Sequence, residues 1–162
     1  MSATMLFLLA MAAAPEPAEL AWADQAVVSG IPAGSAAARR VDALLAALGT
    51  LDYDALATLF APDAVFELPF AGAGVRVSGR AAIVQYLHDT MGRQIEGLKF
   101  TITARYTATE PGVQIVEFTS RGRRLAGDEF GNRLVAVIRL RGDQVTLFRE
   151  YFNPAPVSHP AG

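Results

Sequence analysis

Apolar and polar residues alternate with two different periods along the chain, first that of helices and then that of strands. Apolar residues three and four positions apart predict helices over residues 37–48, 53–60 and 78–93. Gly49 fits the C-cap of the first helix, Asp52 fits the N-cap of the second, and Pro62 stops the second. The inner faces of the first and third helices are predicted to contain Val41, Leu44, Leu45, Leu48, Ile83, Tyr86, Leu87 and either Thr90 or Met91.

Strands are predicted from the alternation of apolar and polar residues over 64–70, 98–109, 113–121, 132–140 and 144–152. The last two segments flank Gly142 and Asp143, which indicates a hairpin. Helices gather in the first half and strands in the second, so we predict an α+β fold with a largely antiparallel, curved sheet. The three helices are expected to cover one face of that sheet.

The last strands are apolar on both sides. Val135 and Val137 point to one face, and Ala136 and Ile138 point to the other. One face goes to the helices, and an antiparallel strand with a wet second face should show polar residues there. We therefore expect a homodimer formed through the outer sheet face. Covering of that face by the N-terminal extension is the alternative.

Residues 1–36 form an N-terminal extension of ambiguous type. The stretch TMLFLLAMAAAPEP has the apolar length of a secretory signal, but no Lys or Arg precedes it, and it is too short to span a membrane. We expect a disordered or linker segment and a cytoplasmic protein, with export through a weak signal as the alternative. The folded domain is assigned to 37–155 and a short tail to 156–162.

Composition excludes several kinds of site. The chain has 162 residues, 52% of them apolar, which is enough for one domain with a real core. Its net charge of −2 gives no basic footprint for nucleic acid, and the absence of Cys excludes disulfides and thiolate metal sites. With only two histidines, we expect no metal and no cofactor.

Three stretches carry a resemblance to a known superfamily: AALGTLDYDALATLFAPDAVFELPF, SGRAAIVQYL and NRLVAVIRLRGDQVTLFREYFNP. They resemble SnoaL-like proteins of the ketosteroid-isomerase-like, nuclear-transport-factor-two-like fold over about residues 37–155. The resemblance implies a cone of curved sheet and three helices around a deep pocket. It does not fix a function, because this fold hosts isomerases, cyclases, dehydratases, epoxide hydrolases and non-catalytic modules.

Residue by residue, the resemblance argues against a ketosteroid isomerase. The positions of its general base and two oxyanion-hole donors correspond to Leu68, Leu44 and Ala136, all of which are apolar here. An Arg-x-Asp pair of the epoxide-hydrolase kind is also not found on a predicted strand. The phenazine-biosynthesis A/B proteins are nearer, because their last strand carries a stretch similar to Arg149–Asn153. That resemblance makes Glu150 an acid/base group, and it places Tyr86 where those proteins have a histidine.

Glu150 is the main candidate for catalysis, with Tyr86 as a donor to a substrate oxygen. In a strand, Glu150 shares a face with Phe148 and Phe152, and a carboxylate in an apolar wall should have a raised pKa. Such a group can give and take a proton near pH 7 without a cofactor. The substrate-binding wall is predicted to consist of Phe66, Leu68, Phe70, Leu87, Phe118, Ala136, Phe148 and Phe152.

Other interpretations of these residues remain open. Glu150 could instead pair with an arginine on its own face or hydrogen-bond to backbone. Asp63 is interpreted as structural, Glu67 as facing outward and His88 as a residue of the rim, while the direction of Glu117 depends on strand register.

Two classes of function follow from this reading. The first is an isomerase, cyclase or dehydratase acting on a small, mostly apolar carbonyl compound such as a polyketide-like molecule. The second is a module of the same fold that only binds a small apolar molecule or dimerises. A pocket above about 300 Å³ with two polar groups would favour the enzyme, and a filled cavity would favour a structural role.

Overall fold

Residues 34–153 are described by the computed structural model, and they form helices first and mainly strands afterwards. The elements in chain order are α2 (Ala36–Thr50), α3 (Tyr53–Leu59), β1 (Phe60–Leu68), β2 (Val75–Ser78), α4 (Arg80–Leu87), the π-helical turn η2 (His88–Gly92), β3 (Ile95–Thr107), β4 (Val113–Arg124), β5 (Glu129–Arg141) and β6 (Gln144–Phe152).

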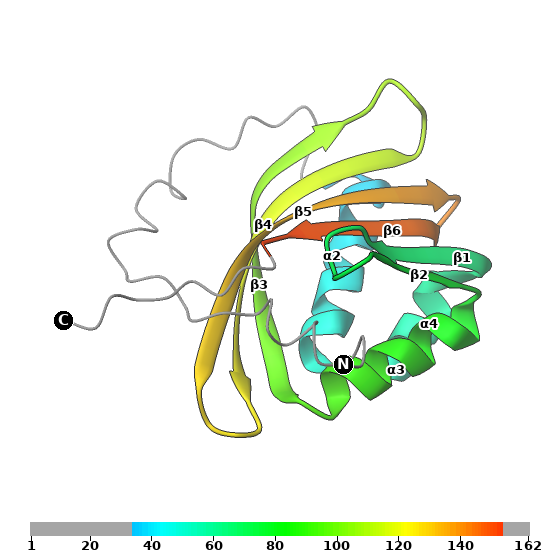
Figure 1. Cartoon of the computed structure of the whole chain (residues 1–162). Coiled ribbons are helices and arrows are strands. Elements are labelled where there is room, and N and C mark those ends of the chain that lie inside the picture. Colours follow the sequence, from blue (N-terminus) through cyan, green and yellow to red (C-terminus); the bar gives the residue numbers. More distant parts are fainter. Residues whose placement is uncertain (1–33, 154–162) are drawn as a thin grey trace.

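All strands belong to one six-stranded sheet with the order β2-β1-β6-β5-β4-β3. Strands β1 and β6 pair in parallel, and every other neighbouring pair is antiparallel. The sheet bends strongly, and α2, α3 and α4 lie against its inner side, called the concave face below (Figure 1). The predicted α+β fold with a mostly antiparallel sheet is therefore confirmed.

The first strand region differs from the prediction. Strand β1 begins at Phe60, directly after α3. Pro62, which was predicted to stop the helix, therefore lies inside this strand. The segment after Gly74, between the strand predicted over 64–70 and the helix predicted from 78, forms the short edge strand β2. Its sequence VRVS does alternate, but four residues are the shortest length at which alternation indicates a strand.

Gly49 does not cap the first helix. The helix continues to Thr50, and Leu51 is the C-cap with a left-handed φ of 56°. Gly49 is buried inside the helix because it touches β3: a Cβ atom at this position would lie 2.5 Å from the carbonyl oxygen of Leu98. The glycine therefore permits close packing of α2 on the sheet.

The third helix is shorter than predicted. Regular α-helix ends at Leu87, and the last five residues form a π-helical turn. In this turn the hydroxyl of Thr90 donates a hydrogen bond of 2.7 Å to the carbonyl oxygen of Tyr86, which competes with regular backbone bonding. The predicted N-cap of α3 is confirmed, since Asp52 accepts a hydrogen bond from the Ala55 amide.

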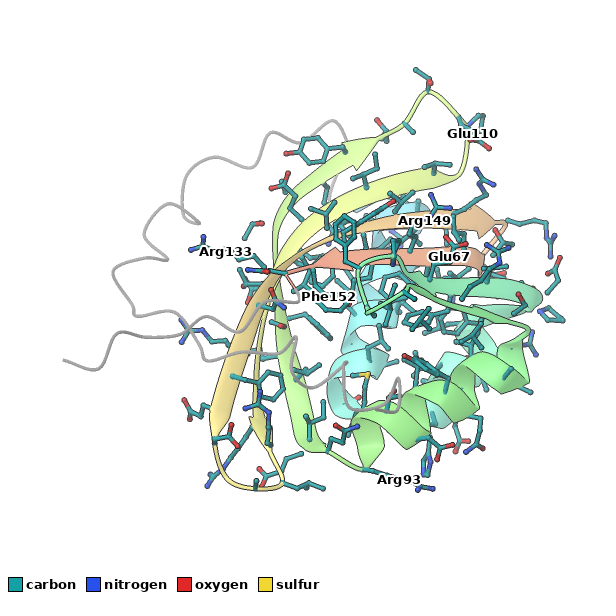
Figure 2. All side chains as sticks on the ribbon, viewed as in Figure 1. Glu67, Arg93, Glu110, Arg133, Arg149 and Phe152 are labelled. Atoms are coloured by element: carbon teal, nitrogen blue, oxygen red, sulfur yellow. The ribbon has the colours of Figure 1, made fainter. Side chains whose placement is uncertain are left out.

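Cross-strand register separates the two faces of the sheet. Glu150 on β6 lies opposite Ala136 on β5, which lies opposite Val116 on β4, and this row faces the helices. Figure 2 shows Phe152 on this concave side and Arg133 pointing the other way, from what is called the convex face. Among the described residues, no helix is both long and apolar enough to cross a bilayer.

Candidate active site

Glu150 lies in the middle of the concave face, between two phenylalanines of its own strand. Phe148, Glu150 and Phe152 are 1%, 8% and 7% exposed, so all three side chains are buried on the same side of β6. Their cross-strand partners on β5 are also apolar and buried. The strand's period of two thus places the carboxyl group inside the core, as the sequence predicted.

A small cavity lies next to Glu150. It has a volume of about 20 Å³ and is lined by Leu48, Phe66, Leu87, Met91, Leu98, Phe100, Leu134, Phe148 and Glu150. This volume holds about one water molecule. Glu150 is the single ionisable side chain in the lining, so the carboxyl group faces an almost entirely apolar space.

Burial raises the pKa of Glu150 from its ordinary value of 4.5 to about 7. The cause is loss of hydration, which disfavours the anion. In the described part of the chain no hydrogen bond or ion pair holds this carboxyl group. The nearest arginine in sequence, Arg149, bonds instead to Glu67 on the convex face, so the alternative of an arginine-paired Glu150 is wrong.

Tyr86 on α4 does not line the cavity, but it contacts Phe66, which does. Its ring packs at 5.8 Å from the ring of Phe66, and Phe66 in turn lies 5.6 Å from Phe148. Burial and the nearby charge of Glu150 raise the pKa of Tyr86. The phenol therefore keeps its proton at neutral pH and remains a hydrogen-bond donor close to the carboxylate.

The predicted wall residues divide into three groups. Phe66, Leu87 and Phe148 line the cavity. Leu68, Phe118, Ala136 and Phe152 are buried in the surrounding core without lining it. Phe70 is not part of this region, because it is 55% exposed and packs edge-on against Tyr151, with which it lines a depression of the convex face.

Five lining residues were not among the predicted wall residues: Leu48, Met91, Leu98, Phe100 and Leu134. Leu48 and Met91 did belong to the predicted inner faces of helices, and this position could have indicated that they line the cavity. The other three come from β3 and β5, and only the bend of the sheet brings them to Glu150.

The remaining polar candidates lie elsewhere. Glu117 faces outward and accepts a hydrogen bond of 3.1 Å from the hydroxyl of Tyr106. The side chain of His88 is half exposed and contacts Asp89. Asp63 pairs with Arg141, whose hydrogen bonds lower the pKa of that carboxyl.

Two other hollows of the surface carry less chemistry. Depressions of about 230 Å³ and 410 Å³ lie on the convex face and beside α2. The second contains an ion pair of Arg105 with Asp42 that already satisfies both groups. Within residues 34–153 no cluster of His, Cys, Asp or Glu side chains has the composition of a metal site. The cavity at Glu150 is therefore the candidate active site.

Comparison with known proteins points to one family. The model of the SnoaL-like domain matches residues 41–148. YesE of Bacillus subtilis is 32% identical over 107 residues, which cover 64% of this chain and 72% of that protein. The PhzA/B-like protein PA3332 of Pseudomonas aeruginosa is 30% identical over 99 residues, covering 59% of this chain and 69% of that protein.

Solved structures agree with this fold. A protein of Catenulispora acidiphila with a ketosteroid isomerase-like fold, in complex with trimethylamine, is 27% identical with a TM-score of 0.61, covering 70% of this chain and 85% of that chain. A ketosteroid isomerase of Mycobacterium and an epoxide hydrolase of M. tuberculosis have TM-scores of 0.61 and 0.63, at identities of 21% and 23% that show the fold alone.

Proposed function

Since the chain belongs to the SnoaL-like domain family, we propose that it is an acid/base enzyme acting on a small, mostly apolar carbonyl compound. The reaction class is isomerisation, cyclisation or dehydration. One observation carries the proposal: Glu150 is an unpaired carboxyl group in an apolar cavity, with a pKa of about 7. A group with this pKa serves equally as base and acid at neutral pH.

The chemistry assigned to the site is proton transfer next to a carbonyl group. The Glu150 carboxylate takes a proton from the carbon beside the carbonyl, and the electron pair moves to the carbonyl oxygen. The phenol of Tyr86 donates a hydrogen bond to that oxygen while its negative charge develops. The protonated Glu150 then returns the proton to another carbon or to a leaving hydroxyl group.

The cavity must open to admit such a substrate. Its volume of about 20 Å³ is far below the roughly 300 Å³ of ordinary ligand pockets. Met91, Leu98 and Leu134 are unbranched or singly branched side chains that can change rotamer, so we assign the opening to them. The small closed volume is also the main support for the alternative of a non-catalytic module.

If the protein is a non-catalytic module, a small amine is the ligand that has independent support. An unpaired carboxylate beside the rings of Phe66 and Phe148 suits an alkylammonium ion, which gains from both charge and ring faces. The Catenulispora relative was solved in complex with trimethylamine. Titration with trimethylammonium, followed by the carboxyl NMR signal of Glu150, tests this second function.

The proposed enzyme function is tested by exchange of hydrogen for deuterium at the carbon beside a ketone. Ketones of increasing size, from cyclopentanone to decalone, are incubated with the protein in D₂O and followed by NMR. Exchange by the wild type should rise with pH, reach half of its plateau near pH 7 and level off above it, and Glu150→Gln should abolish it. Glu117→Gln is the matched control on the convex face. Exchange that survives Glu150→Gln would remove Glu150 from the mechanism.

We also propose that a second copy of the chain packs on the convex face. Val135 is 37% exposed in a central strand, and Phe70 and Tyr151 lie beside it around a depression of about 230 Å³. An exposed apolar patch on a central part of a sheet is typical of an interface between subunits.

A further inference from the structure

Within residues 34–153, three cationic side chains have no polar partner, and they lie together on the convex face. All 14 Lys and Arg residues of the chain fall between Arg39 and Arg149. In the described part of the chain, eleven of them make an ion pair, a hydrogen bond or another polar contact. The other three are Lys99, Arg121 and Arg123, all of which are exposed.

Strand register makes these three residues neighbours. Lys99 on β3 lies directly opposite Arg121 on β4, and Arg123 follows two positions later on the same face. Like charges directly opposite each other destabilise a sheet. Glu129 lies opposite Arg123 and forms no ion pair with it, so the three cations outnumber this one acid in the cluster, which we call the cationic end of the convex face.

A matching negative segment exists in the same chain. Residues 15–33 contain Glu16, Glu19 and Asp24 and no Lys or Arg. All the basic residues and the other 13 of the 16 acidic residues lie in the folded part. The chain thus separates a segment of net charge −3 from a folded part of net charge +1, which favours their association.

The segment is also long enough and partly apolar. It joins the folded part just before Gly34, and its 19 residues span up to about 60 Å when extended. Leu20 and Trp22 lie among its acids. We propose that residues 15–33 dock on the cationic end of the convex face of their own subunit, with their acids against Lys99, Arg121 and Arg123.

This docking leaves room for the proposed second copy. Arg121 lies opposite Gly131, four residues from Val135 on β5, which is about 13 Å along the strand. A single exposed ion pair is weak, so docking depends on the three cations acting together and is released by salt.

The sequence offers a clean test, because Trp22 is the single tryptophan and the chain has no cysteine. A nitroxide on Thr101→Cys, an exposed position two residues from Lys99, should quench the fluorescence of Trp22 in the full-length protein. The same label on Ala82→Cys, on the exposed side of α4, should leave the fluorescence of Trp22 unquenched. High salt or the double variant R121E/R123E should relieve the quenching, and adding E19R/D24R to that double variant should restore it.

Three results would overturn the proposal. The first is equal quenching from both labelled positions. The second is a Trp22 as open to acrylamide as that of a synthetic peptide of residues 15–33. The third comes from mixing labelled Trp22→Phe protein with unlabelled protein: quenching only between different chains would assign the segment to a neighbouring copy. Circular dichroism of each variant establishes that it is folded before it is compared.

Discussion

Glu150 and Glu67 are each 8% exposed, yet they lie on opposite faces of neighbouring strands and have opposite surroundings. Glu67 receives hydrogen bonds from the guanidinium groups of Arg76 and Arg149 on the two flanking strands. Glu150 has only apolar neighbours and a nearby phenol. Equal burial therefore has opposite consequences for the two carboxyl groups.

The first prediction concerns stability against pH. The folded-state pKa of Glu150 lies above its unfolded value, so the folded protein binds the extra proton and stability falls as pH rises from about 4.5 to about 7. The loss is about 3 kcal/mol at most. Glu150→Gln mimics the protonated form, so it should match the wild type at pH 4.5 and be more stable at pH 8.

Urea unfolding of both proteins at pH 4.5 and pH 8 checks this prediction. Comparison with the variant cancels the titration of all other groups, because they are the same in both chains. A difference in unfolding free energy that does not change with pH would show that Glu150 has an ordinary pKa.

The second prediction has the opposite sign. Glu67→Gln removes the anion between Arg76 and Arg149 and should destabilise the protein by about 1–2 kcal/mol at pH 8, less than for a fully buried pair because both arginines are partly exposed. The same denaturant experiment measures it. If Glu67→Gln and Glu150→Gln both stabilise the protein at pH 8, the contrast between the two sites is wrong.

Much of the Glu150 environment could be predicted from the sequence. Period-two alternation placed Phe148 and Phe152 on the side of the carboxyl group, and the strand register bears this out. Phe70 could not be placed in this way, because it follows Pro69 at the end of β1, where alternation stops. Leu98 and Phe100 lie about 50 residues from Glu150, and their contact with the cavity depends on the bend of the sheet.

The third prediction concerns Tyr86. Tyr86→Phe keeps the ring against Phe66 but removes the donor assigned to the developing oxyanion, so deuterium exchange at the ketone should slow about 100-fold. Stability should change little. Tyr106→Phe, whose hydroxyl bonds to Glu117 on the convex face, is the control and should exchange at the wild-type rate. An unchanged rate in Tyr86→Phe would assign the phenol to packing alone.

The fourth prediction concerns the subunit interface. Val135→Glu puts a charge in the centre of the exposed apolar patch and should turn a dimer into a monomer with intact secondary structure. Leu125→Glu replaces another exposed apolar residue, 59% exposed at the β4–β5 turn, and should leave the dimer unchanged. Sedimentation velocity distinguishes the two states. A wild type that sediments as a monomer at all concentrations contradicts the prediction directly.

The last prediction separates intrinsic helix preference from packing. In a helix interior, alanine is more favourable than glycine by about 1 kcal/mol. Gly49→Ala would therefore stabilise an isolated α2. In the folded protein the new Cβ atom would lie 2.5 Å from the carbonyl oxygen of Leu98, and backbone atoms must move to relieve the clash. We expect a net loss of about 2 kcal/mol. Ala46→Gly, at an exposed position of the same helix, should lose only about 1 kcal/mol.

Because Leu48 and Leu98 both line the cavity, a shift of α2 away from β3 should also widen the space at Glu150 and lower its pKa, which the carboxyl NMR titration measures. A Gly49→Ala variant as stable as the wild type would mean that α2 does not pack as closely on β3 as the structure has it.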